Sequence, residues 1–519
     1  MNHLTRFISG LNNIENVVLI AGKYFDENIV KELCKESNVK NIRAYIESPK
    51  SIRAIKRELA DTKAAKKVNI EFYKLDEIKN LESLDKNSVL AFEGKLKFDD
   101  VASLSRLKPD VLCGSMEFAA MTSFEMWEEF KSCTKHIHIL TYGSDRHNEV
   151  LDWKKNEKSD IELSVIFPMY NIAKYLPQCI ESVTAWKADY VEYLFVDDGS
   201  PDNCAEIVEE AAKKDSRIKL LRKENGGCAS ARQYGLENAK GKYIGFIDPD
   251  DYIDESMFRK LLRRAFMGGY EISYSGYKEL YEDLGTTKDV DDLVGMPYML
   301  GTNNRNLILE LVPHLRCAIW RGIYLKDMID LNGIHFYTDL RRFDDLPFKV
   351  ETLAVAKSVV SIPEHLYFYR MSRPGQDVAA NDERLYVHFP IFKHLDEFTE
   401  RIFSKRAGSK EFIEKLQIVK LQTHIYAIKK LLPEYISEYV KQAKKDLLQN
   451  MSFANSLLLY KSSVGKQEIA FYISIVKGNG ETTKALCEKL KKREDSRNMR
   501  KNNVRTDLEK LRNIGLARK

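Results

Sequence analysis

Three apolar runs decide the fold of the central part of the chain: Leu163-Ser-Val-Ile-Phe167, Tyr193-Leu-Phe-Val196 and Tyr243-Ile-Gly-Phe-Ile247. They lead directly into three polar or acidic loops, which are Pro168-Met-Tyr-Asn171, Asp197-Asp-Gly-Ser200 and Asp248-Pro-Asp-Asp251. Short apolar runs separated by helical patterns are typical of buried parallel strands with crossover helices. Since ligands of such sheets bind at the carboxyl ends of the strands, the sequence predicts a ligand site where these loops meet.

A fourth motif, Asn225-Gly-Gly-Cys-Ala-Ser-Ala-Arg232, lies between the second and third loops. In this order the motifs resemble those of the family 2 glycosyltransferases with the GT-A fold, which read S-V-I-I-P-x-Y-N, V-D-D-G-S, N-x-G-x-x-x-A-R and D-x-D-D. The resemblance covers about residues 161–376. It implies an inverting transferase that takes a sugar from a UDP-sugar with the help of Mn²⁺ or Mg²⁺.

The resemblance also implies a set of donor-binding residues. The Tyr170 ring would stack on uracil, and Asp197 or Asp198 would accept the imide N–H of the base. Arg232 matches a position near the base and the phosphates, although a surface cation on a helix is the other interpretation. The full set is Pro168, Tyr170, Asn171, Asp197, Asp198, Asn225, Arg232, Asp248, Arg370 and Arg373.

Asp248 and Asp250 fit a metal site, because Mg²⁺ and Mn²⁺ prefer hard oxygen ligands and leave positions for phosphate oxygens. By resemblance Asp250 is the direct ligand, and Asp248 contacts the ribose or the metal's shell. Asp251 would orient the loop. The alternative is a purely structural acidic turn, for which Asp-Pro-Asp-Asp is equally suitable.

The acceptor hydroxyl needs a base on the other side of the sugar. The family often carries E-D-x-x-F about a hundred residues after D-x-D, and here Asp344-Asp-Leu-Pro-Phe348 stands at that place with Asp for Glu. By resemblance Asp345 is the catalytic base, and the neighbouring Asp344 would raise its pKa. A solvated acidic pair at a helix start is the alternative.

Two further features concern the diphosphate and the acceptor. By resemblance, Arg370 and Arg373 would close over the diphosphate, since the guanidinium donates paired hydrogen bonds; ordinary surface arginines are the alternative. Trp320 would form a platform for the acceptor, or else belong to the core.

Residues 1–150 alternate strand-like and helix-like patterns, which predicts a second, Rossmann-like α/β domain. The expected strands are 17–20, 42–46, 68–73, 88–92, 111–113 and 137–140. A G-x-G-x-x-G turn is missing, so dinucleotide binding is not predicted. A docking or oligomerisation domain, a second transferase and a vestigial nucleotide domain remain alternatives for its role.

The remaining boundaries follow from composition. The charged residues 151–160 are predicted to be a linker, 161–385 the transferase domain with a polar, irregular segment over 281–306, and 386–519 an α-helical region. Eight scattered cysteines without C-x-x-C spacing favour a reducing compartment and argue against zinc or disulfides. With neither a signal-peptide pattern nor a spanning apolar run, a cytoplasmic location is expected.

The net charge of +5 is unevenly placed, since residues 489–519 hold twelve Lys or Arg against four Asp or Glu. This basic tail could hold the enzyme at the anionic inner face of the membrane, or be a solvated end with no partner. No nucleic-acid partner is predicted.

The interpretation is therefore an inverting, metal-dependent transfer of a sugar from a UDP-sugar to a saccharide or lipid-linked acceptor, in surface-polysaccharide synthesis. A bifunctional polymerase with a second site in residues 1–150, and a non-catalytic sugar-binding scaffold, are the rivals. The donor sugar, the acceptor and the oligomeric state stay open.

Overall fold

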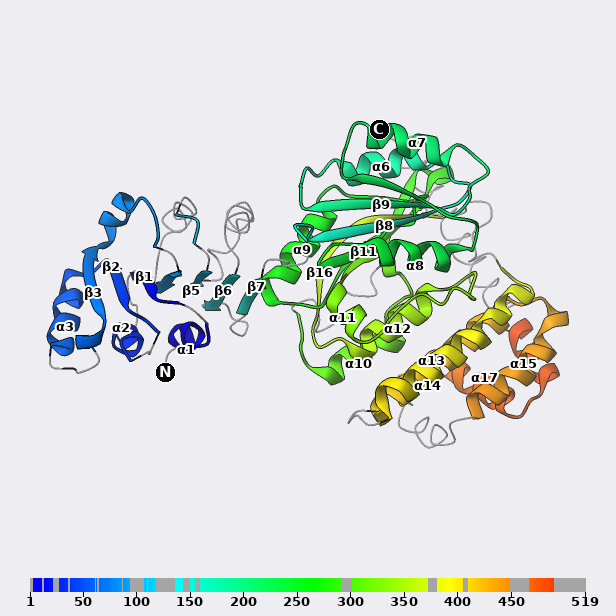
Figure 1. Cartoon of the computed structure of the whole chain (residues 1–519). Helices are drawn as coiled ribbons and strands as arrows, with labels where there is room; N and C mark the ends of the chain where they lie inside the picture. The colour runs from blue at the N-terminus through cyan, green and yellow to red at the C-terminus, as the bar shows by residue number, and fades with distance from the viewer. Residues whose placement is uncertain are drawn as a thin grey trace, which may run out of the picture.

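The structure is a computed structural model. It describes residues 3–11, 14–21, 28–35, 38–60, 62, 65–85, 87–93, 107–109, 111–117, 136–142, 150–154, 159–290, 301–371, 380–404, 409–448 and 466–489. Arg373 and the basic tail beyond Lys489 lie outside these ranges. The chain forms two sheets and a C-terminal group of helices (Figure 1).

The first sheet has the strand order β3-β2-β1-β4-β5-β6-β7. All neighbouring strands are parallel except β6 and β7, which are antiparallel. The order 3-2-1-4-5-6 is that of a doubly wound dinucleotide-type sheet, so the second α/β fold predicted from the strand pattern is confirmed. Its elements are α1 (His3–Ser9), β1 (Asn16–Ala21), α2 (Asn28–Leu33), β2 (Asn41–Ile46), α3 (Pro49–Leu59), β3 (Asn69–Lys74), β4 (Ser88–Glu93), β5 (Val111–Glu117), β6 (His136–Tyr142) and β7 (Val150–Lys154).

Strand β7 corrects the linker prediction. Residues 151–154, placed in the linker for their charge, are part of this strand, which pairs with β6 at the edge of the first sheet. An edge strand accepts charged residues because one of its sides faces no neighbouring strand. Composition alone therefore underestimated the extent of the first sheet.

The second sheet has the order β10-β9-β8-β11-β15-β13-β16-β12, with β14 paired to β13. The three apolar runs are its parallel core strands β8, β9 and β11, as predicted. The strands are β8 (Leu163–Met169), β9 (Val191–Asp197), β10 (Ile218–Arg222), β11 (Tyr243–Phe246), β12 (Tyr252–Ile253), β13 (Ile272–Tyr281), β14 (Thr286–Val290), β15 (Gly322–Leu325) and β16 (Val359–Arg370). The polar segment 281–306 is predicted to be irregular, but it contains the strand β14. This strand is held by an antiparallel ladder of backbone hydrogen bonds to β13, which a polar composition does not predict.

Helices cover both faces of the second sheet. Alternate residues of β8 and β9 point to opposite faces: Phe167 and Phe195 join one core, and Ile166 and Val196 join the other. The helices of this region are α6 (Leu176–Thr184), α7 (Cys204–Ala212), α8 (Cys228–Asn238), α9 (Met257–Gly268), α10 (Arg305–His314), α11 (Lys326–Leu331) and α12 (Asp345–Val355). This two-sided burial fixes the strand ends, and hence the loops that follow them.

The C-terminal region is helical, as predicted. It consists of α13 (His388–Phe403), α14 (Ser409–Lys430), α15 (Pro433–Leu448) and α17 (Lys466–Val476). Helix α13 packs on α12, and α14 packs on α10, so these helices continue one of the two cores of the second sheet (Figure 1). Within the described ranges, no helix has the length and apolar character that crossing a bilayer requires.

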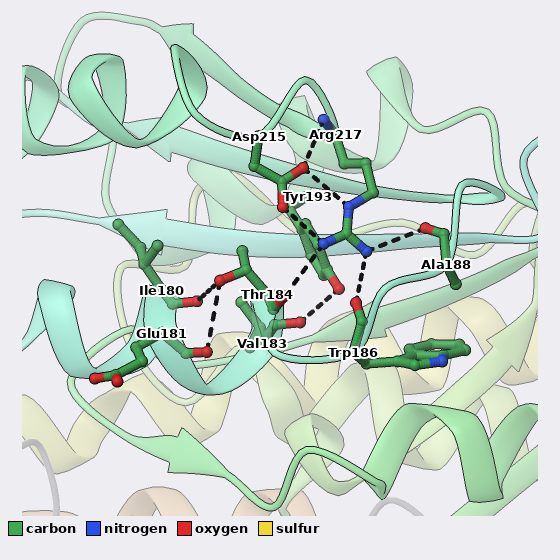
Figure 2. A network of polar contacts seen from close by, with 9 residues as sticks. All are labelled: Ile180, Glu181, Val183, Thr184, Trp186, Ala188, Tyr193, Asp215 and Arg217. Carbon is green, nitrogen blue, oxygen red and sulfur yellow. Dashed lines mark hydrogen bonds and ion pairs between the residues drawn. The ribbon is translucent and has the colours of Figure 1, made fainter.

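Arg217 stabilises the second sheet at the amino ends of β9 and β10, opposite the ends that carry the acidic loops. Figure 2 shows its contacts. Its guanidinium pairs with Asp215 at 2.6 Å and donates to the carbonyls of Trp186, Ala188 and Thr184 at 2.7, 3.1 and 3.3 Å. It also lies over the Tyr193 ring. One side chain thus ties the loop between α6 and β9 to the start of β10.

Replacing Arg217 with alanine is expected to lower the free energy of unfolding by about 2–4 kcal/mol, because three carbonyls lose their donor and the Asp215 carboxylate loses its partner. Arg222→Ala, at the other end of β10, is the matched control, since that side chain is 58% exposed and makes one surface ion pair with Glu209; it should cost under about 0.5 kcal/mol. Urea denaturation measures both, and equal losses would contradict the assignment.

Candidate active site

The acidic loop that follows β11 is anchored by Asp251. This carboxylate is buried and accepts hydrogen bonds from the Tyr367 hydroxyl and the Arg370 backbone N–H, each at 2.7 Å. Burial, then the charges of Asp250 and Asp248, raise the pKa of Asp251 well above its ordinary value. Asp251 thus orients the loop, as its place in the motif implies, and leaves Asp248 and Asp250 half-buried at the end of the strand.

Arg370 lies under this loop, and its position differs from the predicted contact with the diphosphate. Its side chain is buried, donates to the Asp250 carbonyl at 2.7 Å and to Gln178 at 2.9 Å, and pairs with Glu282. It also lies over the Tyr175 ring. A direct phosphate contact would break these bonds, so the structure gives Arg370 the task of holding the loop.

Asp198 organises the loop before α8. Its carboxylate accepts from Lys223 at 2.6 Å and from the backbone N–H groups of Gly226 and Gly227 at 2.9 and 2.7 Å. Asn225, from the same loop, donates back to the Asp198 carbonyl at 3.0 Å. Three donors thus already occupy the Asp198 carboxylate, which orders this loop.

Asp197 ends β9 directly beside the end of β8, where it pairs in register with Met169. Within the described ranges its carboxylate accepts one hydrogen bond, from the Ser200 backbone N–H at 3.0 Å. Tyr170 follows Met169 and is 51% exposed, and Asn171 adopts a positive φ of 54° that turns the chain away. Together with half-buried Pro168, this strand end offers a carboxylate and an open aromatic ring.

Arg232 joins the two acidic loops. Its guanidinium is buried and bonds Asp248 at 2.6 Å and Asp344 at 2.7 Å. Burial alone would lower the pKa of Arg232, but the charges of Asp344 and Asp248 raise it well above its ordinary range. Arg232 is thus not a surface cation on a helix, and the loops that carry Asp248 and Asp344 share its charge.

Gly227 permits this approach of the two loops. It has a φ of +89°, and a Cβ there would lie 3.6 Å from the Cα of Arg341, in the loop that leads to Asp344. Glycine avoids the strain of that backbone conformation. Arg341 is exposed next to the site and is a residue for which the sequence patterns gave no role.

Asp345 begins α12 beside the Arg232 bridge and is half-buried. Its pKa is raised to about 7, first by burial and then by the charge of Asp344, against the opposing effect of Arg232. The predicted upward shift is confirmed, although burial, and not Asp344, is its main cause. A carboxylate with a pKa near 7 suits general-base catalysis at neutral pH.

Trp320 belongs to the core. It is buried and stacks on Tyr367 at 4.0 Å and on Tyr369 at 5.3 Å between ring centroids. Its ring is therefore not open to an acceptor, and the other interpretation, a core tryptophan, is confirmed. Burial, and then the charges of the acidic loop, raise the pKa of half-buried Tyr369.

The loop after β11 fits a divalent cation only in part. In the described ranges no three His, Cys, Asp or Glu side chains gather as a complete metal site. After burial, the charges of Asp250 and Asp248 are the next causes of the raised pKa of Asp251, so negative charge gathers here, and both neighbours are hard oxygen donors. A cation would therefore take its other ligands from the substrate diphosphate and water.

Comparison with known proteins agrees with this geometry. Residues 164–323 match the model of the family described as Glycosyl transferase family 2. Uncharacterized glycosyltransferase EpsJ of Bacillus subtilis (strain 168) is 32% identical over 216 residues, which are 40% of this chain and 60% of that protein. Minor teichoic acid biosynthesis protein GgaB of the same strain is 42% identical over 111 residues, which are 21% of this chain and 12% of that protein.

A solved structure shares the fold. The crystal structure of S. aureus TarS 1-349 in complex with UDP superposes with a TM-score of 0.50 at 16% identity, covering 64% of this chain and 92% of that one. The chain spans about 60% of the length of the first curated relatives that it matches. The expected GT-A-type α/β fold is thus confirmed.

Proposed function

Residues 164–323 form a domain of glycosyl transferase family 2, and from this premise we propose that the chain transfers a sugar, with inversion, from a UDP-sugar to a hydroxyl group of a glycan or lipid-linked acceptor. The observation that carries the proposal is the Arg232 bridge. It brings Asp248 of the donor-side loop and Asp344 of the base-side loop within 2.7 Å of one guanidinium, and it sets Asp345, with a pKa of about 7, beside them.

The nucleotide lies at the ends of β8 and β9. The Tyr170 ring stacks on the base, and the Asp197 carboxylate accepts its imide N–H. The loop ordered by Asp198 brings the N-terminus of α8 to the same edge of the sheet. A UDP complex in the TarS structure, whose fold the chain shares, supports this choice of nucleotide.

The diphosphate lies near Asp248 and Asp250. Bound there, Mn²⁺ or Mg²⁺ would neutralise the charge that develops on the departing diphosphate. The chain itself contributes the fixed position of the two carboxylates, which Asp251 and Arg370 maintain from below. Arg232 limits the repulsion between the donor-side and base-side carboxylates.

The transfer is a single displacement. Asp345 takes the proton from the acceptor hydroxyl, whose oxygen forms a bond to the anomeric carbon as the bond from that carbon to the diphosphate oxygen breaks. UDP leaves with the bonding electrons, and the configuration at the anomeric carbon inverts. Because the chain is similar in sequence to GgaB, a minor teichoic acid biosynthesis protein, we place the reaction in surface-polymer synthesis.

The proposal is tested by incubating the full chain with Mn²⁺ and a panel of UDP-, GDP- and CMP-sugars, and measuring release of the free nucleotide. We expect one UDP-sugar to be hydrolysed slowly in water and to react faster with a glycan acceptor, while GDP- and CMP-sugars release no nucleotide. UDP binding without turnover on any sugar would favour the scaffold alternative, and absence of UDP binding would refute the proposal.

A further inference from the structure

Beside the proposed base lies an exposed aromatic ring that comes from outside the catalytic sheet. Of the exposed large apolar side chains in the described part of the chain, two are aromatic: Tyr170, at the nucleotide end, and Tyr426 on α14, which is 37% exposed. Exposed aromatic rings are costly to leave in water and commonly mark contact surfaces. Helix α14 belongs to the C-terminal helices, which the family match does not include.

Packing places Tyr426 near the active site. Its ring contacts the ring of His388, which contacts that of Phe343, two residues before Asp345. Helix α14 also packs against α10, whose end leads to Cys317. The electrostatics agree with this packing, since burial, and then the charges of Asp345 and Cys317, raise the pKa of the Tyr426 phenol. The C-terminal helices therefore bring an aromatic ring into the neighbourhood of Asp345.

The ring is held in place by a buried network. His388, at the start of α13, contacts the rings of Tyr426 and Phe343 at 6.5 and 5.2 Å between centroids. The Tyr439 hydroxyl lies 3.3 Å from His388 and 3.1 Å from His424. Phe343 directly precedes Asp344, so His388 packs against both the Tyr426 ring and the loop that carries Asp344.

From this arrangement, and resting on the proposed function, we propose that the C-terminal helices complete the acceptor site, with the Tyr426 ring as the platform on which a pyranose ring of the acceptor stacks. The axial C–H groups of a pyranose form an apolar face that matches an aromatic ring, while its hydroxyl groups stay at the rim. Stacked on Tyr426, the sugar presents one hydroxyl toward Asp345. This platform replaces the one predicted at Trp320.

The ring, and not its hydroxyl, should matter for this role. Tyr426→Ala is therefore expected to raise the KM for a glycoside acceptor about tenfold, and Tyr426→Phe to change it less than about twofold. Leu432→Ala is the matched control, because Leu432 is 40% exposed in the same helical region and shares none of the contacts of Tyr426 with the site. Its KM should equal that of the unchanged protein.

The experiment uses the full chain with Mn²⁺ and UDP, and a panel of methyl α- and β-glycosides as probes. Saturation-transfer NMR reports ring contact, and calorimetry with UDP reports the donor site. We expect ring protons of at least one glycoside to receive saturation in the unchanged protein, Tyr426→Phe and Leu432→Ala, but not in Tyr426→Ala, with equal UDP affinity in all four.

Two outcomes would overturn the inference while leaving the proposed function intact. They are UDP binding with no glycoside contact in the unchanged protein, and glycoside contact that survives in Tyr426→Ala. Loss of UDP binding in the unchanged protein would instead refute the proposed function. Equal thermal denaturation of the four proteins confirms that Tyr426→Ala is folded, and UDP affinity provides the second check.

Discussion

Replacing Asp345 with asparagine is expected to reduce sugar transfer about 10³-fold or more while leaving UDP affinity unchanged. The amide cannot take the proton of the acceptor hydroxyl, and general-base groups contribute about 10²–10⁴-fold to such reactions. In the proposed arrangement UDP binds at a different part of the site, at the ends of the paired strands β8 and β9. Calorimetry with UDP and a transfer assay measure the two effects, and a parallel loss of UDP affinity would show that Asp345 is not the base.

The pH dependence gives a second signature of Asp345. Its pKa is raised to about 7, so the base is ionised above that pH and protonated below it. In the unchanged protein kcat/KM should therefore fall about tenfold per pH unit as the pH drops below 7. Asp339→Asn is the matched control, because Asp339 is an exposed carboxylate of the same loop that pairs with His394. The Asp339→Asn variant should retain both turnover and the fall of kcat/KM below pH 7.

The same shift predicts an effect on stability. A carboxyl group whose pKa is higher in the folded state binds more protons there, so it destabilises the fold as the pH rises from about 4 through about 7. Asp345→Asn removes this penalty and should raise the free energy of unfolding at pH 8, on the order of 1 kcal/mol. A variant that is inactive yet more stable distinguishes a lost catalytic group from a damaged fold.

The strands and loops of the site could be predicted because their signals are local. Each apolar run of four or five residues is buried on both faces, and the residues that follow it must lie at the strand end. The place of Asp344 and Asp345 opposite Asp248 followed from the family resemblance. Local patterns and motif order were therefore sufficient for the frame of the site.

Other roles depend on contacts with distant segments, which no local pattern contains. The buried side chain of Arg370, for example, donates a hydrogen bond to Gln178, which lies 192 residues away in the sequence. Asp197 and Asp198 are adjacent and chemically identical, yet only the fold of the Gly226 loop shows which carboxylate is occupied. Tyr426 lies between buried residues of a helix, so its exposure follows from the packing of α14.

Replacing Asp250 with asparagine is expected to cost about 10²–10³-fold in transfer and to remove the dependence of UDP affinity on Mn²⁺. The charge on the departing diphosphate must be neutralised, and Asp250 is a half-buried carboxylate at the carboxyl end of β11, where a hard cation would find an oxygen ligand. Calorimetric titration with UDP, with and without Mn²⁺, gives a readout independent of turnover. Excess EDTA should likewise abolish transfer by the unchanged protein.

Asp251→Asn is the matched control for this prediction, since it makes the same chemical change at the next residue. Burial, and then the charges of Asp250 and Asp248, raise the pKa of Asp251 well above its ordinary value, so an uncharged amide of the same shape costs less there than at a half-buried carboxylate. The amide oxygen still accepts from the Arg370 backbone N–H. Asp251→Asn should thus keep Mn²⁺-dependent UDP affinity and lose less than about tenfold in transfer. Two results would contradict a metal role for the acidic loop: a response to Mn²⁺ that survives in Asp250→Asn, and full turnover of the unchanged protein in EDTA. The loop would then serve the fold, and cationic side chains would have to neutralise the diphosphate. Exposed Arg341 is the first of these to test.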